Sequence, residues 1–505
     1  MRSLTRTLTA SAVFTLTIPI AAPAVANTTL TFKSYSIDAG SSASNLDGSA
    51  CPAGYDMVSG SCHPGYSDQV RIINQYPNQS ADTWRCGFRN NSSSTRTAWV
   101  YTLCDQAGPT GILHQVQVSR YTTTSLTNAR ADEILTDATN VLQTNDGSGD
   151  VACATLWARN GNVTAFSTGD GSIDSSAEFN TVIGLPGQIK VVNQINWCGG
   201  LIPNVIGCAP VPGNSLAVVR YTNSMEGILW AHEYGHNKGL SHRNDTNAVM
   251  NPTIGSTRRR VNQTECNAYR TLPATDAVTE RIMSAQNADA EAVGSDGQSA
   301  AGGSVREFVR QIYIHGVPYD EANRFGADSV PVLVDMLKDP AEQAYWSNIV
   351  VVLGIVGDPA AFAPMVSFIE ERQGGTLNRD YYTAKTSALM SLGYLLNKSG
   401  DRRVLDYLKK ALDPQSWQGG EYGQADYQAS SAERDLDFSK FAILGLAVSG
   451  HPEAAKVLRT LQEQPSTAGE RAVRSQMEEM ISGALKESEE ISNKGLSEYY
   501  REKQH

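Results

Sequence analysis

The chain has 505 residues, of which 41% are hydrophobic and 18% are charged. It is too long for a single hydrophobic core, so we expect two or three domains. Its formal net charge of -11 excludes a nucleic-acid binder, which needs a basic face.

The first 26 residues have the pattern of a secretory signal peptide. Arg2 and Arg6 precede a mostly apolar stretch, residues 8–20, and the run from Ala24 to Ala26 is a small-x-small cleavage signal. We predict cleavage after Ala26 and export to the periplasm or the medium by a bacterial-type pathway. No later stretch is apolar and long enough to span a bilayer, so no membrane span is expected.

The cysteines divide the chain into an oxidised front and a thiol-free back. An even number of cysteines in an exported chain indicates disulfides. There are eight, and none follows residue 266: Cys51, Cys62, Cys86, Cys104, Cys153, Cys198, Cys208 and Cys266.

Residues 27–110 are rich in Ser, Asn, Gly, Thr and aromatic residues, which indicates short strands and turns. We expect a small disulfide-stapled β module here, serving as a prodomain or as a binding module. Local pairing favours Cys51 with Cys62 and Cys86 with Cys104, although four cysteines allow three connectivities.

Residues 111–285 show a mixed pattern. Apolar residues at helical spacing predict a helix over 128–142, and a second helix is expected over about 224–238. Strands are expected at 114–121, 151–157, 189–195 and 216–221. Together they predict an α/β sandwich. Cys198 and Cys208 flank a short glycine-rich loop and should pair, which leaves Cys153 with Cys266.

Residues 286–304 have a linker composition of Ala, Gly, Ser, Asp and Gln, and residues 305–505 look helical and self-similar. Apolar helices carrying Gly354, Gly393 and Gly445 are each followed by a turn and an amphipathic helix. Helix pairs recurring at roughly 40 residues resemble HEAT repeats and predict an all-α solenoid. Such repeats would offer a surface for a protein partner.

The segment from Trp230 to His242 carries the candidate chemistry. His232 and His236 are four residues apart, so on a helix their side chains share one face and can reach one zinc ion. Gly239 can end the helix through a positive φ and fold the chain back, which would bring His242 in as a third ligand. Three protein ligands leave a fourth position for water, as in catalytic zinc sites.

Met250 follows His242 by eight residues, in the run Ala248-Val-Met-Asn-Pro252. A His-Glu-x-x-His-x-x-Gly-x-x-His motif with a nearby methionine resembles the metzincin zinc proteases, and the close spacing is most similar to the matrixin branch. The resemblance implies that Met250 forms a turn beneath the metal and that Pro252 lines a substrate pocket. Ile254 stands where matrixins often have Tyr.

The resemblance implies an exported zinc metalloendopeptidase that cleaves protein or peptide substrates. Zinc would activate a bound water, and Glu233 would take its proton and deliver it to the leaving amine. An extended substrate would lie against an exposed strand edge. The alternative is an extracellular protein-binding HEAT-repeat protein in which proteolysis is incidental or limited to self-processing.

Three further features have plainer interpretations. Cys86 lies in an Arg-Cys-Gly context similar to a matrixin latency motif, but the flanking residues differ and a disulfide is favoured. The acidic loop from Asp170 to Asp174 could bind Ca²⁺ but offers too few ligands to specify a site, so a turn is favoured. The remaining histidines have no ligand partner at useful spacing and are interpreted as surface or packing residues: His63, His114, His315, His451 and His505.

Overall fold

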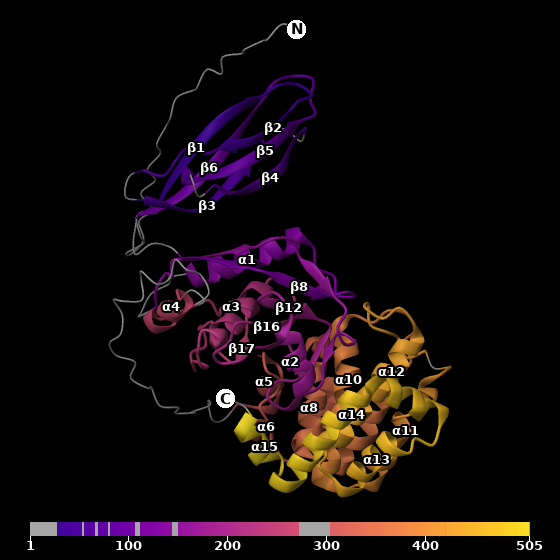
Figure 1. Cartoon of the computed structure of the whole chain (residues 1–505). Coiled ribbons are helices and arrows are strands. Elements are labelled where there is room, and N and C mark those ends of the chain that lie inside the picture. Colours follow the sequence, from indigo (N-terminus) through magenta and orange to yellow (C-terminus); the bar gives the residue numbers. More distant parts are fainter. Residues whose placement is uncertain are drawn as a thin grey trace. The chain divides into compact units, whose positions relative to one another are not determined.

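The computed structural model describes residues 28–52, 55–65, 69–78, 81–106, 112–143, 150–271, 303–419 and 421–503 (Figure 1). The chain divides into two compact units, residues 1–113 with 154–156, and residues 114–153 with 157–505. The predicted signal peptide, 1–26, and all of the predicted linker except residues 303 and 304 lie outside the described residues.

The first unit contains two three-stranded antiparallel sheets, with strand orders β1-β6-β3 and β2-β5-β4. Phe88, Ala98 and Val100 are fully buried in its core. A β-rich module was predicted here. Its strands are β1 (Thr28–Ile37), β2 (Ser42–Asp47), β3 (Tyr55–His63), β4 (Val70–Asn78), β5 (Thr83–Asn90) and β6 (Arg96–Gln106).

The two disulfides predicted for this module are wrong. The observed pairs are Cys51–Cys104 and Cys62–Cys86. Cys62 lies in β3 and Cys86 in β5, so their bond joins the two sheets. Pairing by nearness in sequence failed because the partners are set by which strands meet in space. Because Cys86 is bonded, it is not a free thiol that could bind a metal.

The second unit is built around a five-stranded sheet with the order β10-β8-β12-β16-β15. The first four strands are parallel, and β15 is an antiparallel edge strand. All residues of β12 and β16 are buried, as expected for parallel strands covered on both faces. The strands are β8 (Val118–Tyr121), β10 (Thr164–Phe166), β12 (Ile189–Val192), β15 (Gly207–Cys208) and β16 (Leu216–Val219).

The two long helices predicted near this sheet are confirmed as α1 (Asn128–Gln143) and α3 (Glu226–Asn237), which pack against each other. The predicted Cys153–Cys266 and Cys198–Cys208 disulfides are also confirmed. The smaller elements are β7 (Ile112–Val116), β9 (Thr155–Arg159), β11 (Ser172–Ile173), α2 (Ser176–Gly184), β13 (Gln194–Trp197), β14 (Leu201–Val205), β17 (Thr253–Ile254) and α4 (Gln263–Tyr269).

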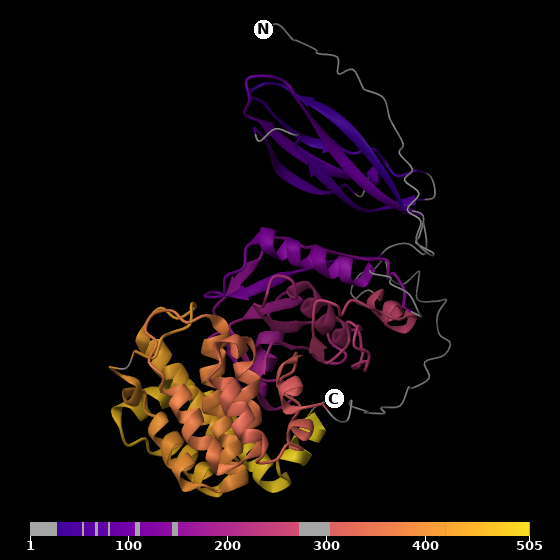
Figure 2. The same ribbon diagram turned by 180° about the vertical axis from the view of Figure 1, so that it is seen from behind.

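The described part of the chain from residue 303 is mostly helical (Figure 2). It contains α5 (Val305–Val309), β18 (Ile312–Tyr313), α6 (Tyr319–Ala322), α7 (Ser329–Leu337), η4 (Pro340–Tyr345), α8 (Trp346–Val356), η5 (Pro359–Ala361), α9 (Phe362–Ile369), α10 (Arg379–Ser399), α11 (Arg402–Ala411), η6 (Pro414–Trp417), α12 (Ser431–Val448), α13 (Pro452–Glu463), α14 (Ala468–Lys494) and α15 (Leu496–Lys503).

The glycines that marked the sequence repeat lie where successive helices touch. A Cβ on Gly354 of α8 would clash with the Ser391 carbonyl of α10. A Cβ on Gly393 of α10 would clash in the same way with the Gly445 carbonyl of α12. Helices α8, α10 and α12 therefore pack side by side at glycine contacts, which explains the spacing seen in the sequence.

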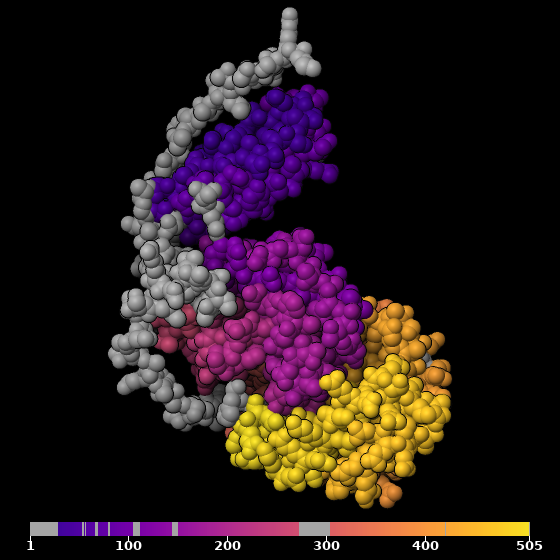
Figure 3. Space-filling model, viewed as in Figure 1, coloured from indigo at the N-terminus to yellow at the C-terminus, as the bar shows by residue number. Residues whose placement is uncertain are grey.

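The helices after residue 303 pack on the region that precedes residue 271 within the same unit, and buried apolar residues of both regions form one cluster. The Tyr499 hydroxyl accepts a hydrogen bond from the Leu201 amide (2.8 Å), and the Trp197 indole donates one to Glu487 (3.0 Å). The abutting surfaces are visible in Figure 3. Neither region therefore forms a core independent of the other.

In the acidic loop at Asp170–Asp174, a lysine side chain of the protein forms ion pairs with the carboxylates. The buried ammonium of Lys440, in α12, lies 3.2 Å from Asp170, 3.4 Å from Asp174 and 3.1 Å from Asp437. The ammonium group of Lys440 thus balances the carboxylates that were considered as Ca²⁺ ligands. Among the described residues, no helix is both long enough and apolar enough to cross a membrane.

Candidate metal centre

Helix α3 places the first two candidate ligands. Every residue of this helix is buried, and His232 and His236 project from consecutive turns of one face. Their imidazole Nε2 atoms are 3.1 Å apart. At the start of the helix, buried Glu226 pairs with Arg130 (2.8 Å) and Arg220 (2.6 Å), which anchors α3 to its surroundings.

The chain reversal predicted at Gly239 is confirmed. Gly239 has φ of +82°, its amide donates to the His236 carbonyl (2.9 Å), and the Leu240 amide donates to the Gly235 carbonyl (3.0 Å). This pair of bonds is a Schellman motif, in which a left-handed residue closes the helix. The reversal returns the chain toward α3, so that the His242 ring centroid lies 4.9 Å from that of His236.

Backbone carbonyls fix the orientation of both helical imidazoles. His232 Nδ1 donates to the Val249 carbonyl and His236 Nδ1 donates to the Leu240 carbonyl, each at 2.8 Å. A neutral imidazole with its proton on Nδ1 has a lone pair on Nε2, which is the form that binds a metal. Burial, followed by the neighbouring imidazoles, lowers the pKa of His232 well below its usual value, so its ring is neutral.

The spacing of these nitrogens fits one shared cation. Lone pairs on two Nε2 atoms 3.1 Å apart repel each other unless a positive charge lies between them. Ligand nitrogens about 2.05 Å from a tetrahedral zinc ion would be separated by about 3.3 Å. His232 and His236 therefore fit one shared metal ion in atom type and spacing, and the candidate ligand atom of His242 lies within 4.8 Å of theirs.

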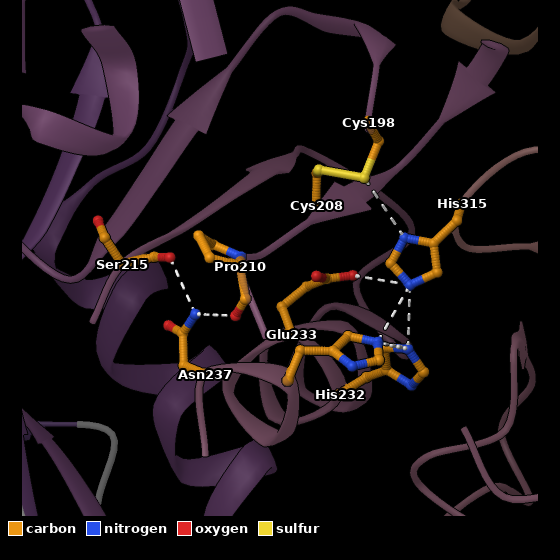
Figure 4. Close-up of a disulfide and its surroundings, with 9 residues drawn as sticks. Cys198, Cys208, Pro210, Ser215, His232, Glu233, Asn237 and His315 are labelled. Atoms are coloured by element: carbon orange, nitrogen blue, oxygen red, sulfur yellow. Dashed lines mark hydrogen bonds and ion pairs between the residues drawn. A yellow bond between two sulfur atoms is a disulfide. The ribbon is translucent and has the colours of Figure 1, made fainter. Parts of the chain in front are cut away.

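A fourth histidine joins this set, and its interpretation as a surface or packing residue was wrong. His315 Nε2 lies 3.4 Å from His232 Nε2 and 3.2 Å from His236 Nε2. The candidate ligand atoms of all four histidines lie within 4.8 Å of one another. The fourth position, which was expected to be left to water, therefore has an imidazole directed at it (Figure 4).

Strand pairing brings His315 to the centre from a distant part of the sequence, 83 residues after His232. Antiparallel pairing of β17 with β18 sets Thr253 opposite Tyr313 and Ile254 opposite Ile312. The sequence signal was a short apolar run, Ile312-Tyr-Ile-His315, followed by a glycine. That signal predicts a short strand but not which strand it joins.

Glu233 lies beside the histidines with no direct hydrogen-bond partner. Its side chain is fully buried, and among the described residues neither carboxylate oxygen has a hydrogen-bond partner. Its Oε1 atom is 3.8 Å from His315 Nε2. Burial raises the pKa of Glu233 well above its usual value. A buried carboxylate without a partner is costly, and this one points at the space where a metal and its ligands would lie.

Gly207, in edge strand β15, makes room for that carboxylate. A Cβ at this position would clash with the Glu233 carboxyl group. This close approach puts the edge strand directly beside Glu233. The Cys198–Cys208 disulfide, whose second cysteine belongs to the same strand, also lies near the site (Figure 4).

Met250 packs against α3. It is fully buried, a Cβ on Gly235 would clash with its sulfur, and the Tyr269 hydroxyl contacts that sulfur at 3.2 Å. The Pro252 carbonyl accepts a hydrogen bond from the Ile314 amide (3.0 Å). Met250 supports α3 between its two histidines, and Pro252 borders the segment that carries His315.

The other histidines do not join the centre. His114 is buried and bonds the Tyr269 carbonyl (2.7 Å) and the Tyr234 hydroxyl (2.9 Å), in agreement with a packing role. His451 caps α13 by accepting from the Glu453 amide. His63 is half-buried in the first unit, and His505 lies outside the described residues.

A scan against protein-family models found no match to this chain, and a search of curated proteins found no match either.

Proposed function

We propose that this protein is an exported, zinc-dependent endopeptidase of the metzincin type. The observation that supports this most is the pairing of two features. Three imidazoles from one short segment lie close together, and beside them is the buried carboxylate of Glu233, which has no hydrogen-bond partner among the described residues. Glu233 is not one of the candidate ligands, so its carboxylate can accept a proton from a metal-bound water.

The proposed division of labour follows from the geometry. His232, His236 and His242 would hold the metal. Zinc at this point would polarise the scissile carbonyl and lower the pKa of water to about 7. Glu233 would accept a proton from that water and deliver it to the leaving amine, a role worth about 10²–10⁴-fold in rate.

The disulfides support one part of this proposal, that the protein is exported. Four disulfides are typical of proteins from oxidising compartments. The HEAT-like interpretation of the helices after residue 303 stays part of the proposal, as does a protein partner on their surface.

A second candidate function has one observation in its favour. His315 supplies a fourth imidazole, and four protein ligands are typical of structural zinc sites. In that case the metal would only fasten the segment around residue 315 to the rest of the unit, and the protein would act through its binding surfaces.

The test is cleavage of casein or gelatin by the zinc-loaded full chain. Because His315 is directed at the fourth position, unmodified protein and a His315→Ala variant are assayed in parallel, each with and without Glu233→Gln. We expect Glu233→Gln to reduce cleavage by about 10²–10⁴-fold in both backgrounds while zinc content stays the same. Equal cleavage with and without the Glu233 carboxylate would overturn the peptidase proposal.

A further inference from the structure

The segment Ile312–His315 lies between two backbone edges beside the candidate metal centre. On one side, β18 pairs with β17, which follows the Met250 turn. On the other, the Ile314 carbonyl accepts hydrogen bonds from the Ile206 amide (2.9 Å) and the Gly207 amide (3.4 Å) at the free edge of the five-stranded sheet. The two-residue strand β18 and the turn residues Ile314 and His315 that follow it thus lie between the sheet edge and the wall at Pro252–Ile254.

This is the position that an extended peptide substrate would need. Peptides that bind by strand addition use the free amides and carbonyls of an edge strand. Here β15 is the edge strand, and Gly207 within it lies against Glu233. The amide of Gly207 and that of Ile206, which precedes β15, already donate to the Ile314 carbonyl. The chain continues from Ile314 into His315, whose imidazole meets the other three.

The segment is firmly held. Ile314 and Tyr313 are buried at 1% and 5% exposure. The Asn348 side chain, from α8, donates to the carbonyls of Val309 (3.1 Å) and Gln311 (2.6 Å) just before the strand. The same side chain accepts from Asn204 at the end of β14 (3.1 Å). The strand is therefore fixed from both the sheet side and the helical side.

We propose that Ile312–His315 is a built-in pseudo-substrate: its backbone fills the substrate strand position and its terminal imidazole takes the fourth metal position. This inference deepens the proposed peptidase function and rests on it. It implies a latent enzyme whose activity requires this segment to be displaced. It also identifies the outward amides of Ile206 and Gly207 as the groups that bind the substrate backbone.

The pseudo-substrate has two separable parts, and two variants remove them in turn. His315→Ala removes the imidazole but leaves the strand in place. Ile314→Gly with His315→Ala also removes the buried side chain that holds the strand. His451→Asn is the matched control, because it replaces a histidine outside the centre and keeps a residue type that caps α13 well.

The first measurement is the visible absorption spectrum of the Co²⁺-loaded full chain, titrated with acetohydroxamate. Unmodified protein and His451→Asn should show the intense bands of a closed four-ligand site and a weak response to acetohydroxamate. His315→Ala should still bind one Co²⁺, show weaker bands, and bind acetohydroxamate at least tenfold more tightly. Identical spectra and identical acetohydroxamate affinities in all three proteins would overturn the inference.

The second measurement is hydrogen exchange at Ile206 and Gly207, which does not depend on activity. Their amides should exchange slowly in unmodified protein and at least tenfold faster in the double variant. Binding of a peptide hydroxamate should then slow them again. Slow exchange that persists in the folded double variant would overturn the strand part of the inference.

Cleavage of casein separates this inference from the proposed function. The double variant should cleave at least tenfold faster than unmodified protein. If the spectra and exchange rates change as expected but no variant cleaves any protein, the four-ligand pseudo-substrate geometry stands and the peptidase proposal fails. If unmodified protein already cleaves as fast as the double variant, latency is refuted while the peptidase proposal stands.

Discussion

The four histidines of the centre come from two regions that position their rings in different ways. In the segment from α3 to Met250, ring orientation is set by local bonds: the Nδ1 atoms of His232 and His236 each donate to a carbonyl of the same segment. His315 is instead carried in by backbone pairing of β18 with β17 and with the sheet edge. The two orienting bonds of the first arrangement involve no residue of the second. A bound peptide strand could make the same backbone hydrogen bonds that the segment carrying His315 makes.

The largest expected contrast between the two regions is in metal affinity. His236→Gln removes a ligand that the local carbonyl bond pre-orients, so we expect zinc affinity to fall by more than about 100-fold, beyond the usual loss for an outer-shell partner. His315→Gln should lower zinc affinity less than this, because it leaves His232 and His236, whose rings are oriented by carbonyls of their own segment, in place with His242. Competition with a chromogenic chelator measures both, and equal losses would show that the two regions contribute alike.

Gly207→Ala tests the contact between the edge strand and Glu233. The added Cβ would displace the carboxyl group, and misplacement by about 1 Å can cost 10²-fold in rate. We expect a fall of that order in kcat in the His315→Ala background, with zinc affinity kept. Gly184→Ala is the control, because its Cβ would meet nothing within 4 Å. Similar kcat values for the two variants would remove Gly207 from the site.

Gly239→Ala tests the reversal that brings His242 to the metal. A Cβ here would meet no neighbour within 4 Å, so the effect should come only from the left-handed backbone, at about 1–2 kcal/mol of unfolding free energy. We expect a lower melting temperature and a modest loss of zinc affinity, both measured against unmodified protein. No change in either would mean that the turn relaxes without cost.

An effect on the pH dependence of stability is expected near the loop where Lys440 joins the helical region to the sheet. Burial, and then Asp174 and Asp170, raise the pKa of Glu178 to about 8. A carboxyl whose pKa is raised by folding stabilises the protein below its unfolded pKa, about 4.5, and this contribution is lost as pH rises through about 8. The melting temperature should therefore decline between these values.

Glu178→Gln should flatten that decline, because Gln does not titrate and can still accept the hydrogen bond from the Asp174 amide (2.7 Å). Thermal unfolding followed by circular dichroism from pH 4.5 to 8 measures the effect. Glu463→Gln, at an exposed position, is the control. Parallel curves for unmodified protein and the Glu178 variant would refute the assignment.

Sequence patterns predicted those features that depend on neighbours in the chain. The period of apolar residues gave α1 and α3 within a few residues, and the spacing from His232 to His242 with Gly239 predicted three converging histidines and the reversal. The glycines at 354, 393 and 445, which marked the interval between helices in the sequence, lie at contacts between α8, α10 and α12, where the close approach of two backbones leaves no room for a side chain.

Features that depend on which distant strands pair were missed. The Cys62–Cys86 bond joins two sheets, and no local pattern specifies that contact. His315 was missed for the same reason, since backbone pairing with residues distant in sequence, such as that of Ile312 with Ile254, brings it to the other histidines. Lys440 likewise reaches Asp170 and Asp174 from a helix that lies far along the chain.

The most direct test of the account is cleavage of casein by zinc-loaded Ile314→Gly/His315→Ala protein, with and without Glu233→Gln. The account predicts cleavage by the double variant and a loss of about 10²–10⁴-fold when the Glu233 carboxylate is also removed, at equal zinc content. Undiminished cleavage without that carboxylate, or no cleavage by the folded, zinc-loaded double variant, would contradict it.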